Sequence, residues 1–184
     1  MPAWGWILIG IAVLVVAAVI WAATRRRRTA DLRKTFGSEY DRTANESDSR
    51  RRAESELAAR RDRREQLDIR PLTPAARGRY EDRWRQVQMA FVDDPSGALR
   101  NADEAVILVM RERGYPMDDF DQRASDLSVD HPDVVQNYRA AHGIAMANDQ
   151  GQASTEDLRQ AMVHYRSLFE GLLGDDGSEM PVAR

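Results

Sequence analysis

A continuous apolar run near the N-terminus constrains this chain more than any other feature. The run WGWILIGIAVLVVAAVIWAA extends from Trp4 to Ala23, and residues 1–24 carry no ionisable side chain. About twenty residues at roughly 1.5 Å rise per residue cover the roughly 30 Å hydrocarbon layer of a bilayer. We therefore predict a transmembrane helical anchor within residues 1–24.

Three tryptophans stand near the two ends of this run. Trp4, Trp6 and Trp21 occupy positions where indole rings favour the membrane interface, because the ring is apolar and its N–H needs a polar partner. A cleaved signal peptide is the alternative, but it would carry positive charge before its apolar region. The charge here follows the run, which favours an uncleaved anchor in contact with the lipid bilayer.

Four consecutive arginines give the anchor a direction. Arg25, Arg26, Arg27 and Arg28 follow the run directly, and cytoplasmic flanks carry the excess of basic residues. We expect a single-pass protein with its N-terminus outside and its C-terminal bulk in the cytoplasm. Within the run, the small residues Ala18 and Ala22 suit either helix pairing or a monomeric anchor.

Charge is divided unevenly between the two parts of the chain. Residues 1–70 hold 15 basic and 10 acidic side chains, net +5, whereas residues 71–184 hold 12 and 20, net −8. Basic clusters beside a membrane are attracted to anionic lipid, so anionic lipid is a candidate partner. The acidic part disfavours nucleic-acid binding. The absence of cysteine excludes disulfides, thiolate metal sites and thiol nucleophiles.

Residues 25–70 are predicted to form a basic juxtamembrane tether and a charged helix. Residues 29–49 show no sustained apolar period and read as a tether, in which Phe36 and Tyr40 are either stray aromatics or headgroup contacts. Residues 50–69 are rich in helix formers and predict a solvated helix. A coiled coil through Ala53 and Leu57 fails, because the register next places arginines at core positions.

Residues 71–174 predict a compact bundle of about five helices. Pro71 and Pro74 mark its start, and Gly114 is suited to end the second helix. The expected helices, each with an apolar stripe at helical spacing, cover residues 74–92, 95–113, 118–127, 132–147 and 155–174. Residues 175–184 predict a disordered tail. The fold class is therefore all-α, with a transmembrane helix, a charged helix and a helical domain.

Four stretches in the C-terminal domain carry a family resemblance that covers about Tyr80 to Leu173. The stretches WRQVQMAFVDDPSGAL, VMRERGYPMDDF, DLSVDHPDVVQNYRAAHGI and STEDLRQAMVHYRSLFEGLL resemble a family of small, uncharacterised bacterial membrane-associated proteins. The resemblance implies a bacterial, membrane-linked, helical protein, and hence the inner membrane. It implies no activity, cofactor or catalytic residue.

One acidic stretch has the residue types of a metal or catalytic site. In DLSVDHPD, the side chains of Asp126, Asp130 and His131 are candidate ligands for a divalent ion or candidates for acid–base work. The simpler interpretation is that Asp130 or His131 caps a helix starting at Pro132. His142 and His164 read as a core histidine and a histidine at the edge of an apolar stripe, unless adjacent helices bring them together on a metal.

No recognised reaction motif occurs in the chain. It contains no G-x-S-x-G elbow, phosphate-binding glycine loop or HExxH, so we expect no cofactor and no enzymatic activity. The expected function is a membrane-anchored interaction or scaffolding module with an acidic helical domain that binds a protein partner. Two alternatives remain: a metal-dependent hydrolase or small-ligand-binding domain using DLSVDHPD, and a membrane organiser that binds anionic lipid.

Overall fold

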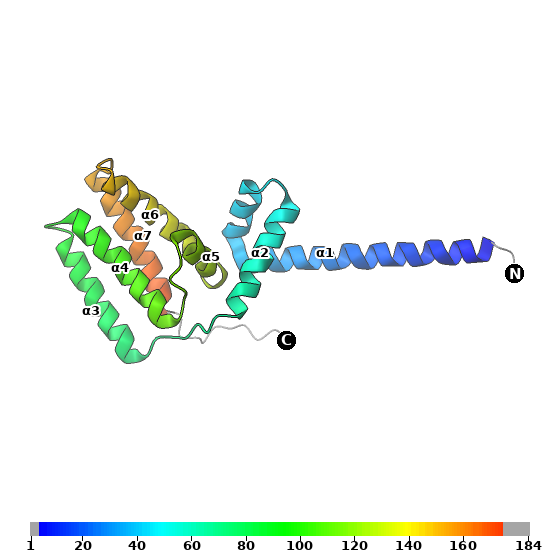
Figure 1. Ribbon diagram of the computed structural model, residues 1–184, viewed down its shortest axis with the longest axis horizontal. Coiled ribbons are helices and arrows are strands. Elements are labelled where there is room, and N and C mark those ends of the chain that lie inside the picture. The colour runs from blue at the N-terminus through cyan, green and yellow to red at the C-terminus, as the bar shows by residue number, and fades with distance from the viewer. Residues whose placement is uncertain (1–3, 175–184) are drawn as a thin grey trace. The chain divides into compact units, whose positions relative to one another are not determined.

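The chain is entirely α-helical in the part that the structure describes. The computed structural model describes residues 4–174, without the side chains of residues 5–11. Seven helices and no strand occur within these residues, which confirms the all-α prediction (Figure 1). The helices are α1 (Trp4–Glu46), α2 (Arg50–Glu65), α3 (Pro74–Ala90), α4 (Pro95–Arg113), α5 (Phe120–Asp130), α6 (Val135–Asp149) and α7 (Thr155–Gly174).

The chain divides into two compact units, Met1–Ala58 and Ala59–Arg184. The first unit holds α1 and the first half of α2, while the last two turns of α2 belong to the second unit together with α3 to α7. Helix α1 passes the predicted end of the anchor at Thr24 without a break. The predicted disordered tail, residues 175–184, lies outside the described residues.

The predicted tether is wrong, because residues 29–46 are helical. Leu32, Phe36 and Tyr40 recur at steps of four and are 5%, 0% and 1% exposed. Leu32 and Phe36 lie one turn apart on one face and Tyr40 follows in the next helical segment, and burial of these side chains favours helix although the neighbouring residues are polar. The helix is broken at Gly37, whose φ of 46° and ψ of −124° are not helical. That backbone conformation is open to glycine and strained for other residues.

Helix α2 is also less solvated than predicted. Ala53 and Leu57 lie one turn apart on one face, and both are fully buried. The residues around them are charged and mostly exposed, so the helix has a narrow apolar stripe instead of none.

The first half of α1 exposes large apolar side chains. Between Val13 and Trp21, the exposed fractions of the large apolar side chains lie between 55% and 71%. Among the residues that the structure describes, no helix is both long enough and apolar enough to count as a membrane span.

Short polar side chains start four of the five helices from α3 to α7. The side chains of Thr73, Asp94 and Asp119 each accept a hydrogen bond from the backbone N–H three residues ahead. At α7, Ser154 and Asp157 form a reciprocal capping box: Asp157 N donates to Ser154 Oγ, and Ser154 N donates to Asp157 Oδ2. These caps satisfy N–H groups that the first turn leaves unpaired.

The start of α6 differs from the prediction. The helix begins at Val135, not at Pro132, and its first turn has no side-chain cap. Asp130 instead ends α5, and the backbone N–H of the next residue, His131, donates to Leu127 O. The backbone N–H groups of Val134 and Val135 donate to His131 O. A backbone carbonyl therefore accepts the hydrogen bonds that a capping side chain was expected to accept.

Helix α7 lies at the centre of the second unit's packing. It packs against α4 and α6, and α3 packs on another side of α4 (Figure 1). Trp84 of α3 stacks on Phe169 of α7 with ring centroids 4.6 Å apart. The predicted apolar stripes are confirmed, since the following residues of α4 and α7 are all buried: Ala98, Ala102, Ala105, Val106, Val109, Met110, Leu158, Met162, Tyr165, Leu168, Phe169 and Leu172.

Two glycines offer a matched test of this fold. Gly114 ends α4 with φ 98°, and a Cβ there would lie 2.5 Å from the backbone oxygen of Asp68. Gly143 lies inside α6 with open space around the same position. We expect Gly114→Ala to destabilise the protein by about 2 kcal/mol or more and Gly143→Ala to stabilise it by about 0.5 kcal/mol. Thermal unfolding of the full chain in detergent measures both; an equal effect of the two substitutions would contradict the assigned backbone conformation.

Candidate functional site

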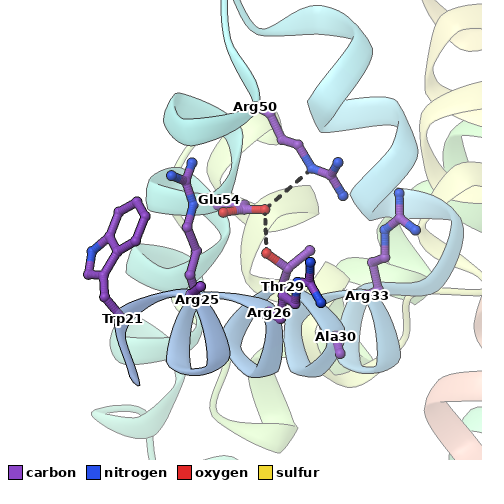
Figure 2. A pocket seen from close by; sticks show the side chains of 9 residues that line it. Trp21, Arg25, Arg26, Thr29, Ala30, Arg33, Arg50 and Glu54 are labelled. Atoms are coloured by element: carbon purple, nitrogen blue, oxygen red, sulfur yellow. Dashed lines mark hydrogen bonds and ion pairs between the residues drawn. The ribbon is translucent and has the colours of Figure 1, made fainter. Parts of the chain in front are cut away.

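A groove lined by arginines lies between the middle of α1 and the start of α2. It encloses about 430 Å³. Figure 2 shows the arginines of α1 on one side of it, and Arg50 and Glu54 of α2 opposite. Residues four apart share a helix face, so α1 lines the groove with two adjacent columns: Trp21, Arg25, Thr29 and Arg33, and beside them Ala22, Arg26 and Ala30.

Glu54 and Tyr40 fasten α2 to α1 at this groove. The Glu54 carboxylate accepts hydrogen bonds from Thr29 Oγ1 at 2.8 Å and from the Tyr40 hydroxyl at 3.0 Å. Arg50 Nε donates to the Tyr40 oxygen at 2.9 Å and lies 3.5 Å from Glu54 Oε1. These contacts raise the pKa of Arg50, the hydrogen bond to Tyr40 contributing most. These contacts orient the Arg50 guanidinium toward the groove.

Aromatic rings hold two more of the arginines. The Arg25 guanidinium lies 5.4 Å from the Trp21 ring centroid, and that of Arg33 lies 5.0 Å from the Tyr40 ring centroid. Such cation–π contacts orient a guanidinium and leave its N–H groups free to donate. No carboxylate of the described residues pairs with Arg25, Arg26 or Arg33. Four arginines and one glutamate give the groove a formal charge of +4 − 1 = +3.

The residues predicted to set membrane topology divide between two faces. Arg25 and Arg26 line the groove, whereas Arg27 and Arg28 do not. Of the predicted interfacial tryptophans, Trp21 lines the groove and Trp4 is 80% exposed. The side chain of Trp6 lies outside the described residues.

The predicted metal candidates of the second unit are paired with arginines. Asp126, 1% exposed, accepts a hydrogen bond from Arg63 Nε at 2.9 Å, and Asp130 accepts one from Arg64 Nε at 2.5 Å. Asp130 also accepts a 2.7 Å hydrogen bond from the Tyr115 hydroxyl. Burial and the nearby Asp130 raise the pKa of Tyr115, so the phenol keeps the proton that it donates. A guanidinium group thus pairs with one oxygen of each carboxylate, while Asp126 Oδ2 is buried and has no hydrogen-bond partner among the described residues.

The histidines also have other neighbours. His131 Nε2 lies 3.4 Å from Arg113 Nη1, and buried Arg113 donates from the same nitrogen to Leu172 O at 2.9 Å. His142 stacks on Phe120, and burial lowers the pKa of His142. His164 Nδ1 lies 2.9 Å from Asn137 Oδ1. Within residues 4–174, no three His, Asp or Glu side chains gather as they would around a metal ion.

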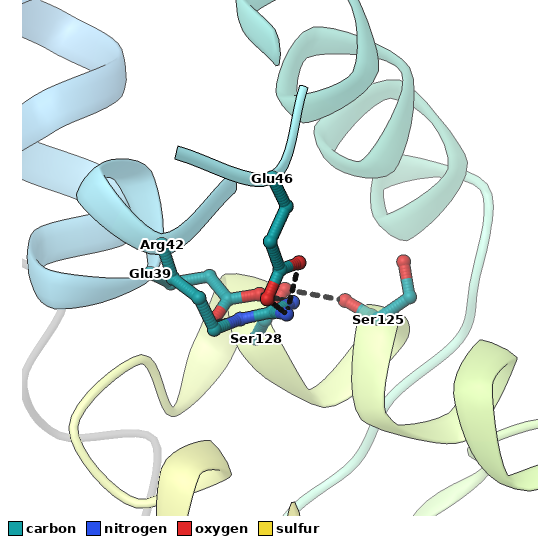
Figure 3. A network of polar contacts seen from close by, with 5 residues as sticks. All are labelled: Glu39, Arg42, Glu46, Ser125 and Ser128. Atoms are coloured by element: carbon teal, nitrogen blue, oxygen red, sulfur yellow. Dashed lines mark hydrogen bonds and ion pairs between the residues drawn. The ribbon is translucent and has the colours of Figure 1, made fainter. Parts of the chain in front are cut away.

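Two further polar contacts, one in each unit, are drawn in Figure 3. In the first unit, Arg42 bridges Glu39 and Glu46, with hydrogen bonds of 3.0 and 2.9 Å to fully buried Glu39. These hydrogen bonds raise the pKa of Arg42. In the second unit, Ser128 Oγ donates to the backbone oxygen of Ser125 at 2.6 Å. Both are internal contacts that leave the buried polar groups paired.

Comparison of the chain with protein-family models, with curated proteins and with solved structures gives no match. The resemblance to membrane-associated bacterial proteins therefore stays a prediction, and the functional argument depends on the geometry above.

The sequence prediction missed Arg33, Arg50 and Glu54 as groove residues. The signal was the spacing of four between Trp21, Arg25, Thr29 and Arg33, which becomes a helix face only if residues 29–36 are helical. Because residues 29–49 were predicted to be a tether, the sequence prediction did not place these residues on one helix face and did not find the groove that they line.

Two aspartates that share one arginine test whether this acidic stretch is an internal ion-pair network. Asp126 and Asp118 both accept from Arg63, but their side chains are 1% and 50% exposed. Removing a buried partner leaves groups unsatisfied, whereas an exposed ion pair contributes little. We expect Asp126→Ala to lower the free energy of unfolding by about 2 kcal/mol and Asp118→Ala by less than about 1 kcal/mol.

The same unfolding measurement addresses the metal alternative. The arginine pairing predicts that divalent ions leave the wild-type melting temperature unchanged. A rise with manganese or zinc that disappears in Asp126→Ala would instead support a metal site at this stretch.

Proposed function

We propose that this protein is a membrane-anchored interaction module, in which α1 inserts into the bilayer and carries a helical unit at the cytoplasmic surface. The observation that carries the proposal is the exposure of apolar side chains along α1. Val13, Leu14, Val15, Val16, Val19 and Ile20 are all more than half exposed. The proposal takes residues 4–23 as a whole, including residues 5–11, whose side chains lie outside the structural description.

Water is a poor solvent for the exposed apolar side chains of residues 13–20. Exposing six large aliphatic side chains costs on the order of 10 kcal/mol relative to burying them. The exposed side chains include consecutive residues, Val13 to Val16, which in a helix point in different directions. One partner helix can cover a single stripe, whereas hydrocarbon covers all faces at once.

The direction of insertion follows from the arginines after the run. Arg25 to Arg28 lie at its C-terminal end, and the N-terminal flank before Trp4 has no basic side chain. The positive-inside bias therefore supports an external N-terminus and a cytoplasmic C-terminal unit.

The chain's lack of cysteine makes this topology directly testable. We expect a membrane-impermeant maleimide to label Pro2→Cys in sealed right-side-out vesicles and to label Gln152→Cys only after detergent is added. Gln152 is exposed, so its protection would come from the bilayer and not from folding. Equal labelling of both positions before detergent would contradict insertion, and the opposite pattern would reverse the orientation.

The second part of the proposal is that the helical unit binds a protein partner through its acidic surface. What supports it is the net charge of −8 over residues 71–184, which favours a partner with a basic surface. The full chain in detergent should retain such a partner at low salt and release it at about 0.5 M salt, where the screening length falls below about 5 Å. A partner that stays bound to a chain ending at Arg70 would contradict this assignment, as would one that high salt does not release.

A further inference from the structure

We infer that the arginine groove of the first unit binds the phosphate group of an anionic phospholipid. The inference rests on the proposed membrane anchoring and names the ligand class of a site within it. The groove has a formal charge of +3, an opening that admits a ligand, and three guanidinium groups without a carboxylate partner among the described residues.

Three of the four groove arginines have contacts that orient them before any ligand arrives. Arg50 is held by the Tyr40 hydroxyl and Glu54, Arg33 by the Tyr40 ring, and Arg25 by the Trp21 ring. Fixing these side chains in advance lowers the entropy lost on binding. Arginine is also suited to this chemistry, because its planar fork donates two parallel hydrogen bonds to phosphate oxygens.

Glu54 is the one acidic residue that lines the groove among the described residues. Its carboxylate is 16% exposed, accepts hydrogen bonds from Thr29 and Tyr40, and lies 3.5 Å from Arg50 Nε, so it connects the α2 side of the groove to α1. It cancels one positive charge and leaves three. A phosphodiester carries one negative charge, so the groove is electrostatically complementary to it with charge to spare.

The position along α1 favours a lipid phosphate over a free one. At about 1.5 Å rise per residue, Arg25 and Arg26 lie about 6 to 8 Å beyond Trp21 along the helix axis. The headgroup layer on each side of a bilayer is about 5 to 8 Å thick. If Trp21 lies at the interface, these two arginines therefore reach lipid phosphates, and the indole beside them contacts the upper acyl chains.

The matched test uses two double variants that remove the same charge. In Arg25→Gln/Arg26→Gln both residues line the groove, and in Arg27→Gln/Arg28→Gln neither does, although all four follow Trp21 within two helical turns. The full chain in detergent micelles is titrated with dioleoyl phosphatidylglycerol, and bound lipid is measured by native mass spectrometry. We expect the groove variant to bind at least about tenfold more weakly than the control variant, because directed charge-assisted hydrogen bonds are lost.

Arg25 also contacts the Trp21 ring, so a single variant guards against a change in local structure. Arg26 lines the groove and has no ion pair or ring contact with another described side chain. Arg26→Gln should keep the wild-type melting temperature and still bind phosphatidylglycerol more weakly than Arg27→Gln. Equal binding by Arg26→Gln and Arg27→Gln, or by the two double variants, would mean that only diffuse charge attracts lipid and would overturn the site.

Two comparison ligands identify the source of the phosphate. Phosphatidylcholine has the same phosphodiester with a compensating cation, and we expect it to bind more weakly than phosphatidylglycerol. Inorganic phosphate should compete only weakly. Competition by inorganic phosphate as effective as that by the lipid would overturn the lipid assignment.

Failure of this inference is separable from failure of the anchor. Arg26→Gln keeps residues 1–24 and the other three arginines of the flank, so its cysteine labelling should match that of the wild-type groove. One-sided labelling without any phosphatidylglycerol preference would overturn the groove site and leave the anchor standing.

Discussion

The Tyr40 hydroxyl is the point on which the first unit depends. It donates to Glu54 and accepts from Arg50, while the face of its ring receives Arg33. One side chain thus connects residues of α1 on both sides of Gly37 with the first turns of α2. Because Tyr40 is 1% exposed, its polar group must be paired, and the pairing decides how α2 lies on α1. The arginine groove is a result of that arrangement.

The second unit differs, because apolar residues at helical spacing account for most of its packing. Its five helices were predictable because each has a stripe at helical spacing and most have a polar cap at the start. Val87 and Val109 were placed inside by their register, and both are buried. The start of α6 was not predictable in this way, since a backbone turn replaces the side-chain cap. Capping side chains can be recognised in a sequence, whereas a helix start that depends on backbone hydrogen bonds has no residue type that marks it.

The candidate sites were harder to predict than the fold for a related reason. Asp126, Asp130 and His131 are close in sequence and look like ligands, but their partners Arg63, Arg64 and Arg113 lie far away in the chain. The sequence therefore displays the aspartates as a cluster, but it does not show that distant arginines pair with them. The groove has the converse problem: its arginines were visible as a topology signal, but Arg50 and Glu54 arrive from another helix. Long-range pairing decides both cases.

The break at Gly37 has an evolutionary consequence. Its φ of 46° with ψ of −124° is a conformation that a side chain would strain by about 1 to 3 kcal/mol. Arg33 and Tyr40 lie on opposite sides of this break, and their contact depends on the direction the chain takes there. A residue with no side chain therefore governs a groove that it does not line. Position 37 should therefore vary among relatives only together with the residues that line the groove.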